Sequence, residues 1–325
     1  MRWSFPILLA TMGALAWLSA SSSLPTEIFI FAIAALGFNV LYGMTGLLSF
    51  GQSVFFGGAA YCCGLLGMAY PLGAPMLTLA GGLTGLLVAL FFSLISLRSR
   101  GIYFVMLTLA LGQVGYFLAL TFKEYTGGEN GLSGLARPDV TVFGRVLFEL
   151  QSPASFMGYC AAVLILAFLF VEMLSRSPLG SVLTALRLNE ARTEVLGYRT
   201  RWFRLAAFSI SGFMTGVAGA LYAMFLRFVP LNTIDFETAE KLVIMTIIGG
   251  VGSSLGPVVG AALFLLAADL LSPIWPRWLM IMGVLLVLVV MVFKGGVVDL
   301  ALARIRQRRG AARDGALRAA EEDAA

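Results

Sequence analysis

The chain is a succession of long apolar runs separated by short polar segments. An α-helix needs roughly 20 consecutive apolar residues to cross the hydrocarbon core of a bilayer. Only 12% of the 325 residues are charged, whereas a soluble domain carries roughly 25%. The runs therefore predict an all-α polytopic membrane protein. The candidate spans are about 5–20, 26–44, 50–70, 75–97, 101–122, 154–174, 202–226 and 275–293.

A further apolar region at 241–272 is interrupted by GGVGSSLGP, from Gly249 to Pro257. Lysine and arginine collect in cytoplasmic loops, which places Arg2, residues 98–100 and the segment 175–201 on the same side as the basic C-terminal tail. When the spans alternate from Arg2, the region 241–272 must cross the membrane an even number of times. We therefore expect two short helices broken at the glycine run, about ten transmembrane segments, and both termini in the cytoplasm.

Residues 1–296 are expected to form a single transmembrane domain, followed by a basic tail at 297–325 that we expect to be disordered. The tail carries five arginines between residues 304 and 313. Beside a membrane domain, such a patch marks the cytoplasmic side of the bilayer rather than an arm that binds nucleic acid. The N-terminal run is expected to be an uncleaved first helix rather than a signal peptide, because another apolar run follows it at once.

The ionisable residues limit the chemistry that this chain performs. It has no histidine, so the commonest metal ligand and the usual proton shuttle are missing, and we expect no metal site. Its three cysteines lie in apolar runs and do not indicate a disulfide framework. An ion-driven carrier needs buried ionisable groups, yet Glu27, Glu172 and Asp269 lie near the ends of predicted spans. An ion-coupled secondary transporter and a passive small-amide channel remain as alternatives.

Glycine is unusually frequent, at 37 of the 325 residues, and it recurs at four-residue spacing. In lipid, small residues at this spacing let helix backbones approach closely. The spacing therefore predicts tightly packed helix pairs. The glycines concerned are Gly81 and Gly85, Gly212 and Gly216, and the series Gly252, Gly256 and Gly260.

Two stretches combine glycine with hydroxyl and amide side chains near membrane depth, LYGMTGLLSFGQS at 41–53 and IIGGVGSSLGPVVG at 247–260. Irregular backbone at that depth is tolerated only where protein buries it or where it lines a wet cavity. Broken helices of this kind form the substrate path of many transporters, while local helix packing remains the alternative for each residue. The candidate pathway residues are Asn39, Gly43, Gly46, Ser49, Gln52, Gly249, Gly250, Gly252, Ser253 and Ser254.

Residues 177–204 form a charged segment between two apolar runs. Ser177, followed by proline, is typical of a helix start. The apolar stripe of this helix turns polar after Leu186, so two short helices bent near Asn189 fit the pattern better than one long helix. Gly197 is typical of a helix stop.

The charges of this segment suit two roles. At about 100° per residue, Arg187, Glu190 and Glu194 fall on one helix face, which fits a docking surface and equally a solvated connector. The chain has no G-x-x-x-x-G-K-[ST] phosphate loop. If transport uses ATP, another chain must bind it, and this segment is the only internal loop large enough for that chain to hold.

Five blocks in order carry a resemblance to a known family. Together they resemble the LivM-type permease subunits of branched-chain amino acid ABC importers, over roughly residues 30–295. The blocks are ALGFNVLYGMTGLLSFGQSVFFGGAAY (35–61), RGIYFVMLTLALGQ (100–113), TGGENGL (126–132), SPLGSVLTALRLNEARTEVLGY (177–198) and IIGGVGSSLGPVVGAAL (247–263).

The resemblance implies a multi-pass permease of the bacterial inner membrane that imports branched-chain amino acids, or related amino acids, amides or organic acids, by alternating access. It implies three kinds of partner besides the lipid bilayer: a LivH-like second permease, two ATPase subunits and an external substrate-binding protein. ATP and Mg²⁺ would be bound by the ATPase subunits, so neither a cofactor nor an enzymatic step is expected on this chain.

The resemblance also implies which residues meet these partners. The segment 177–200 corresponds to the cytoplasmic element that contacts the ATPases. The external loop 123–153 would dock the binding protein, with a plain ordered loop as the alternative. The coupling residues are Arg187, Asn189, Glu190, Arg192, Glu194 and Gly197, and the docking residues are Thr126, Gly127, Gly128 and Asn130.

The chain departs from related patterns at two places. The general importer motif E-A-A-x3-G is not met, because Arg192 follows Glu190 and Ala191 and the glycine comes one place late, at Gly197. Gln52 stands where histidine is common in the resembled family, so a titratable group is absent beside the expected pathway.

Overall fold

The computed structural model describes residues 23–96, 98–99, 101–142 and 145–273, with isolated positions at 277, 280, 281, 283, 284 and 287. The expected first span at 5–20 and the basic tail at 297–325 lie outside the described residues. The same holds for nearly all of the expected span at 275–293.

Six helices in the described part of the chain are long and apolar enough to cross a bilayer. Each coincides with one of the expected spans, which confirms the all-α membrane architecture for the described residues. The number of ten spans and the side on which the termini lie remain predictions. The six are α2 (Leu24–Thr45), α3 (Gln52–Ala69), α4 (Ala74–Ser96), α5 (Ile102–Thr121), α7 (Pro153–Arg176) and α10 (Thr200–Leu226).

Two shorter helices, α11 (Phe236–Gly249) and α12 (Gly256–Leu271), follow α10. The prediction of two short helices broken at the glycine run is therefore confirmed. At 1.5 Å per residue they measure about 21 and 24 Å, less than the roughly 30 Å of a hydrocarbon core.

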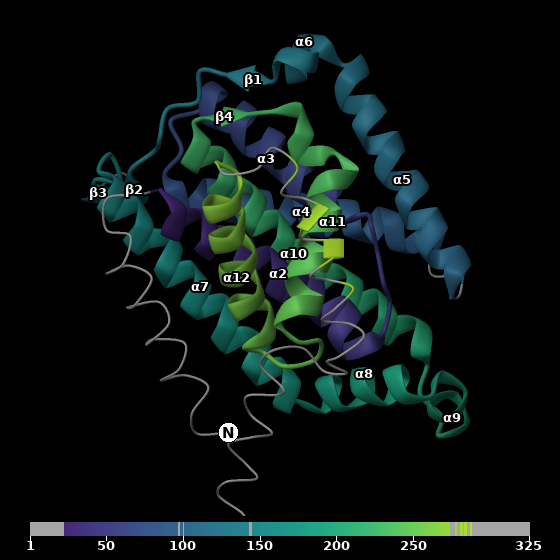
Figure 1. Ribbon diagram of the computed structural model, residues 1–325. Coiled ribbons are helices and arrows are strands. Elements are labelled where there is room, and N and C mark those ends of the chain that lie inside the picture. The colour runs from purple at the N-terminus through teal and green to yellow at the C-terminus, as the bar shows by residue number, and fades with distance from the viewer. Residues whose placement is uncertain are drawn as a thin grey trace, which may run out of the picture.

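Helix α2 is the centre of the bundle (Figure 1). Ninety-four per cent of its most apolar window is buried, against 22% for α5 and 28% for α7. A helix that is apolar all round is stable only when other helices or lipid cover every side. The burial places α2 among other helices, whereas α5 and α7 turn most of their apolar surface outward, where a bilayer or a second subunit would cover it.

Helices α4 and α10 pack backbone to backbone. A Cβ atom on Gly85 would lie 2.2 Å from the carbonyl oxygen of Gly212, and one on Gly216 would lie 2.4 Å from that of Gly81. Gly260 approaches α11 in the same way, because its Cβ would lie 1.8 Å from the oxygen of Met245. The predicted close packing of these glycines is confirmed.

One end of the bundle carries all the strands of the described residues (Figure 1), and we call it the stranded end. In the described part of the segment between α5 and α7, β1 pairs antiparallel with β4, and β2 pairs antiparallel with β3. The elements of this end are α6 (Lys123–Thr126), η1 (Gly128–Asn130), β1 (Leu132–Ser133), β2 (Val140–Val142), β3 (Arg145–Phe148), β4 (Phe228–Val229) and η2 (Leu231–Ile234).

The opposite end carries α8 (Pro178–Leu188) and α9 (Glu190–Val195), which lie across the end of the bundle (Figure 1). We call it the arginine-rich end, after the arginines of 176–204. The C-terminal end of α2 and the turn between α11 and α12 meet α8 at this end.

Candidate functional site

The segment 177–199 folds as its sequence predicts. The hydroxyl of Ser177 accepts a hydrogen bond from the amide of Gly180 at 3.2 Å and so caps α8. Asn189 ends α8 and caps α9, because its Oδ1 accepts from the amide of Arg192 at 3.0 Å. Gly197 has a φ of +90°, a conformation that glycine adopts without strain. The predicted pair of short helices with a bend at Asn189 is confirmed.

The carboxylates of α9 hold this helix against the start of α10. Glu190 forms an ion pair with Arg204 at 3.4 Å, and Glu194 accepts a hydrogen bond from the hydroxyl of Thr200 at 2.9 Å. The expectation that Arg187 shares one helix face with Glu190 and Glu194 is wrong, because the break at Asn189 places Arg187 on a different helix.

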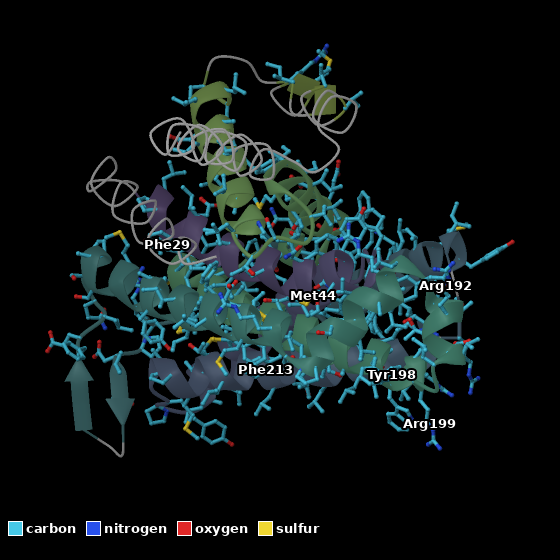
Figure 2. The ribbon with its side chains drawn as sticks, turned by 90° about the horizontal axis from the view of Figure 1, so that it is seen from below. Phe29, Met44, Arg192, Tyr198, Arg199 and Phe213 are labelled. Carbon is cyan, nitrogen blue, oxygen red and sulfur yellow. The ribbon has the colours of Figure 1, made fainter. Side chains whose placement is uncertain are left out.

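Sequence reasoning did not single out the most exposed large apolar side chains of this segment. Leu188, Val195 and Leu196 are 81%, 87% and 74% exposed. Figure 2 shows Arg192, Tyr198 and Arg199 on the same edge of the molecule. The sequence held no clear signal for this exposure, because apolar residues are expected throughout a membrane protein. We define the α9 surface as Leu188, Arg192, Val195, Leu196 and Arg199.

Asn39 of α2, which precedes the first glycine-rich stretch by two residues, contacts the second stretch at the arginine-rich end. Its amide nitrogen donates to the carbonyl oxygen of Ser253 at 3.1 Å, and its Oδ1 accepts from the amide of Gly252 at 3.0 Å. Asn39 is 1% exposed. The Asn39 side chain thus pairs with one backbone amide and one backbone carbonyl of the turn between α11 and α12. Neither group has a partner within a helix.

Gly43 leaves the space that this contact needs. A Cβ at this position would lie 2.1 Å from Oδ1 of Asn39 and 3.0 Å from the amide nitrogen of Gly252. The carbonyl oxygen of Gly43 accepts a hydrogen bond from Nη1 of Arg187 at 2.6 Å. A predicted coupling residue and four predicted pathway residues (Asn39, Gly43, Gly252 and Ser253) therefore lie in one cluster.

The turn itself depends on its glycines and on Ser253. Gly250 and Gly252 have φ values of +125° and +94°, which other residues rarely adopt. A Cβ on Gly249 would lie 1.8 Å from the carbonyl oxygen of Gly256. The hydroxyl of Ser253 accepts from the amide of Gly256 at 3.0 Å, which satisfies one of the free amides at the start of α12. Ser254 is half-buried beside it.

The remaining pathway candidates lie apart from this cluster. Gln52 is fully buried between α3 and α10, where its amide donates to Ser211 at 2.9 Å and accepts from Thr215 at 2.9 Å. Ser49 is also fully buried, and its hydroxyl accepts from the amide of Gly51. Gly46 ends α2 with a φ of +77°. In this conformation Asn39, Ser49 and Gln52 are closed off from solvent.

A cavity of about 320 Å³ opens between the end of α4 and the start of α10. None of its lining residues was predicted to take part in transport. They are Ser93, Leu94, Arg201, Trp202 and Leu205. Among the described residues, no group of three or more cysteine, aspartate and glutamate side chains is placed to hold a metal ion.

The predicted docking residues at the stranded end form a tight turn. The hydroxyl of Thr126 donates to the carbonyl oxygen of Ala119 at 2.6 Å and accepts from the amide of Gly128. Gly127 and Gly128 have φ values of +76° and +60°. Asn130 is exposed. The side chain of Thr126 is thus used internally, while Asn130 is free to meet another molecule.

The chain is similar to known transport proteins along most of its length. A family model described as "Branched-chain amino acid transport system / permease component" matches residues 9–290. The high-affinity branched-chain amino acid transport system permease protein LivM of Escherichia coli (strain K12) is 29% identical over 308 residues, which cover 89% of this chain and 72% of that protein. The LivM protein of Salmonella typhimurium is 28% identical over 313 residues, covering 90% of this chain and 73% of that protein.

A shorter match reaches a protein with a different cargo in its name. The autoinducer 2 import system permease protein LsrC of Yersinia pestis (strain Pestoides F) is 29% identical over 208 residues, which cover 61% of this chain and 56% of that protein. No solved structure matches the chain.

Proposed function

Because the chain belongs to the family of branched-chain amino acid transport system permease components, we propose that it is the membrane-spanning subunit of an ATP-driven importer. The match to LivM proteins confirms the resemblance carried by the five sequence blocks. Six apolar helices support a multi-pass protein, which we place in the bacterial inner membrane. The chain itself performs no chemical step and provides the path that the cargo follows.

Four further subunits complete the proposed importer. Two ATPase subunits bind ATP and Mg²⁺, a LivH-like permease pairs with this chain, and a substrate-binding protein delivers cargo from outside. The sequence supports a separate ATPase, because it contains no phosphate-binding loop. The stranded end would face the binding protein, and the arginine-rich end would face the cytoplasm, where positive charge collects.

The α9 surface is the observation that carries this proposal. Three apolar side chains lie exposed on and on either side of a short helix, Leu188, Val195 and Leu196, with arginines beside them. Such a group is typical of a surface that a partner covers. The carboxylates of α9 are engaged with Arg204 and Thr200, so α9 is tied to α10. A partner that grips α9 would therefore move a helix that runs through the bundle.

Transport would proceed by alternating access. Closure of the ATPases around ATP would move α8 and α9, and the two permeases would rock between outward-open and inward-open states. The burial of Asn39, Ser49 and Gln52 indicates that the proposed path is closed in this conformation. It would have to open by a change in how the helices pack.

The proposed cargo is a branched-chain amino acid or a related small amino acid, amide or organic acid. The names of the two LivM proteins support the first of these. The similarity to an autoinducer 2 permease indicates that related chains serve other cargoes. In such importers the external binding protein selects the cargo, so its identity decides among these classes.

Co-purification from detergent tests the proposal at the α9 surface. The tagged chain is compared with Leu196→Asp, which places a charge at the centre of that surface. Tyr125→Asp is the matched control, because Tyr125 is similarly exposed (63% against 74%) but lies at the stranded end. We expect two ATPase subunits and a second permease to accompany the wild type and the control, and the ATPases to be lost from Leu196→Asp. ATPases that remain with both variants, or that accompany none, would contradict the proposal.

A further inference from the structure

We propose that Arg187 is a positioning residue that transmits movement of α8 and α9 to the turn between α11 and α12. The inference rests on the proposed function. It assigns one residue to the step in which movement of α8 and α9 reaches the helices of the bundle. It also separates Arg187 from the other coupling candidates, because Arg187 points its guanidinium at the bundle rather than at the α9 surface.

The first observation is the hydrogen bond from Arg187 to the end of α2. The last four carbonyl oxygens of a helix have no partner within it, and that of Gly43 is one of them. Nη1 of Arg187 donates to this oxygen at 2.6 Å. A cation is favoured at the C-terminal end of a helix, where the carbonyl oxygens give a partial negative charge. Arg187 therefore fixes α8 to α2, the most buried of the six long apolar helices in the described part of the chain.

The second observation is that the same guanidinium lies against the broken turn. Nη1 of Arg187 lies 2.8 Å from the position that a Cβ on Gly252 would take. Cγ of Arg187 lies 3.4 Å from the position that a Cβ on Gly46 would take. A side chain at position 252 would therefore meet the guanidinium of Arg187. Arg187 thus occupies a space bounded by α2, by the residue that ends α2, and by the turn.

The third observation is that the turn is held from the other side by Asn39. The amide of Asn39 spans the gap between α2 and the turn through Gly252 and Ser253. When Arg187 moves, either its bond to Gly43 breaks or the end of α2 moves with it. A movement of the end of α2 would reach the contact between Asn39 and the turn, because Gly43 and Asn39 lie one helical turn apart. Loss of the bond would free the carbonyl oxygen of Gly43 and release the guanidinium from the turn.

The connection to the partner surface is short. Arg187 is followed by Leu188 of the α9 surface and by Asn189, which caps α9. Only Leu188 and Asn189 separate Arg187 from the start of α9. A partner that moves α9 therefore moves Arg187 with it. Lysine would replace this contact only in part, because an ammonium lacks the planar fork of donors that a guanidinium presents.

Hydrogen exchange on the purified importer tests the inference without knowledge of the cargo. Two peptides are followed with no nucleotide and with ATP plus vanadate, which traps ATPases in a closed state. One peptide covers residues 188–199 and reports docking, and the other covers residues 246–256 and reports the turn. The variants are Arg187→Gln, Arg187→Lys and the control Arg176→Gln, whose arginine pairs with Glu172 on α7 at the same end.

In the wild type and in Arg176→Gln, we expect nucleotide to change the exchange of both peptides. In Arg187→Gln, the peptide at 188–199 should still respond, while the response at 246–256 falls below half of the wild-type value. Arg187→Lys should retain an intermediate response, which a purely structural role would not produce.

Three outcomes would overturn the inference. An unchanged response at 246–256 in Arg187→Gln would show that the turn moves without this contact. Loss of the ATPases from Arg187→Gln would assign Arg187 to docking or folding instead. If no ATPase accompanies the wild type, the proposed function fails and the inference fails with it, so the two failures are distinguished by the wild-type purification alone.

Discussion

Buried amide side chains connect helices that glycine brings close together in this protein. Asn39 joins α2 to the turn after α11, and Gln52 joins α3 to α10 through Ser211 and Thr215. A buried amide that loses its partners costs roughly 1–3 kcal/mol, so each of these contacts favours one arrangement of helices. The arrangement at Asn39 depends on the missing side chain of Gly43.

Gly43→Ala is expected to destabilise the protein by about 1–3 kcal/mol. The added Cβ would lie 2.1 Å from Oδ1 of Asn39, so the amide must turn away and give up its bonds to the turn. Thermal unfolding in detergent measures the change. Gly58→Ala is the matched control, because a Cβ there meets no atom within 4 Å, and it should be neutral or stabilising by up to about 1 kcal/mol. Equal melting temperatures for the two variants would contradict this role for Gly43.

The sequence predicted these residues as polar groups near membrane depth but not their partners. A pattern along one chain shows that Asn39, Gln52 and Ser253 are unusual in an apolar run. It does not show that Asn39 and Ser253, which are 214 positions apart, meet each other, or that Gln52 faces α10. Such pairing depends on how helices pack, and single-chain periodicity contains little information about that.

At the scale of helices, the pair α4 and α10 shows what spacing alone can predict. The four-residue glycine spacing in both helices indicated close approach, and the two pairs indeed oppose each other. The break in 241–272 and the bend at Asn189 were also predicted, because glycine and asparagine end helices for local reasons. The strand pairs at the stranded end were not predicted, since β1 and β4 are only two residues each.

Gly216→Ala should weaken the contact between α4 and α10. The new Cβ would lie 2.4 Å from the carbonyl oxygen of Gly81 and 2.9 Å from Cα of Gly85, and backbone atoms cannot rotate away as a side chain can. Overpacking of this kind costs about 1–3 kcal/mol. We expect a lower melting temperature in detergent.

The control for this helix pair is Gly158→Ala on α7, where a Cβ has no neighbour within 4 Å. Alanine is a better helix former than glycine, so this variant should melt at the wild-type temperature or above it. A Gly216→Ala protein that melts no lower than Gly158→Ala would show that the close approach contributes nothing to stability.

At the scale of the whole molecule, the alternation of helices brings the polar segments to two opposite ends (Figure 1). The arginines of 176–204 all belong to one end, and this asymmetry was readable from the sequence by the preference of positive charge for the cytoplasm. The exposure of the apolar residues of the α9 surface could not be predicted from the sequence, because hydrophobic residues in a membrane protein are expected everywhere. Their exposure becomes evident only once α9 is seen to lie outside the bundle.

Cysteine labelling in intact cells measures the orientation directly. Tyr125→Cys at the stranded end should react with a membrane-impermeant maleimide added outside, and Leu196→Cys should react only after the cells are opened. The wild type supplies the background, since Cys63 and Cys160 are buried and Cys62 is half-buried. Labelling of Leu196→Cys in intact cells would reverse the assigned orientation and place the α9 surface outside, away from any ATPase.

Uptake by reconstituted vesicles tests the central claim most directly. The purified complex is placed in vesicles with its binding protein, and radiolabelled leucine is the probe. Uptake is compared with ATP available to the arginine-rich end, with a sodium or proton gradient alone, and with neither. The account predicts accumulation only with ATP, and none when Leu196→Asp replaces the wild type. Accumulation driven by an ion gradient, or equilibration without any energy source, would contradict an ATP-driven permease, and uptake under none of the three conditions would contradict leucine as its cargo.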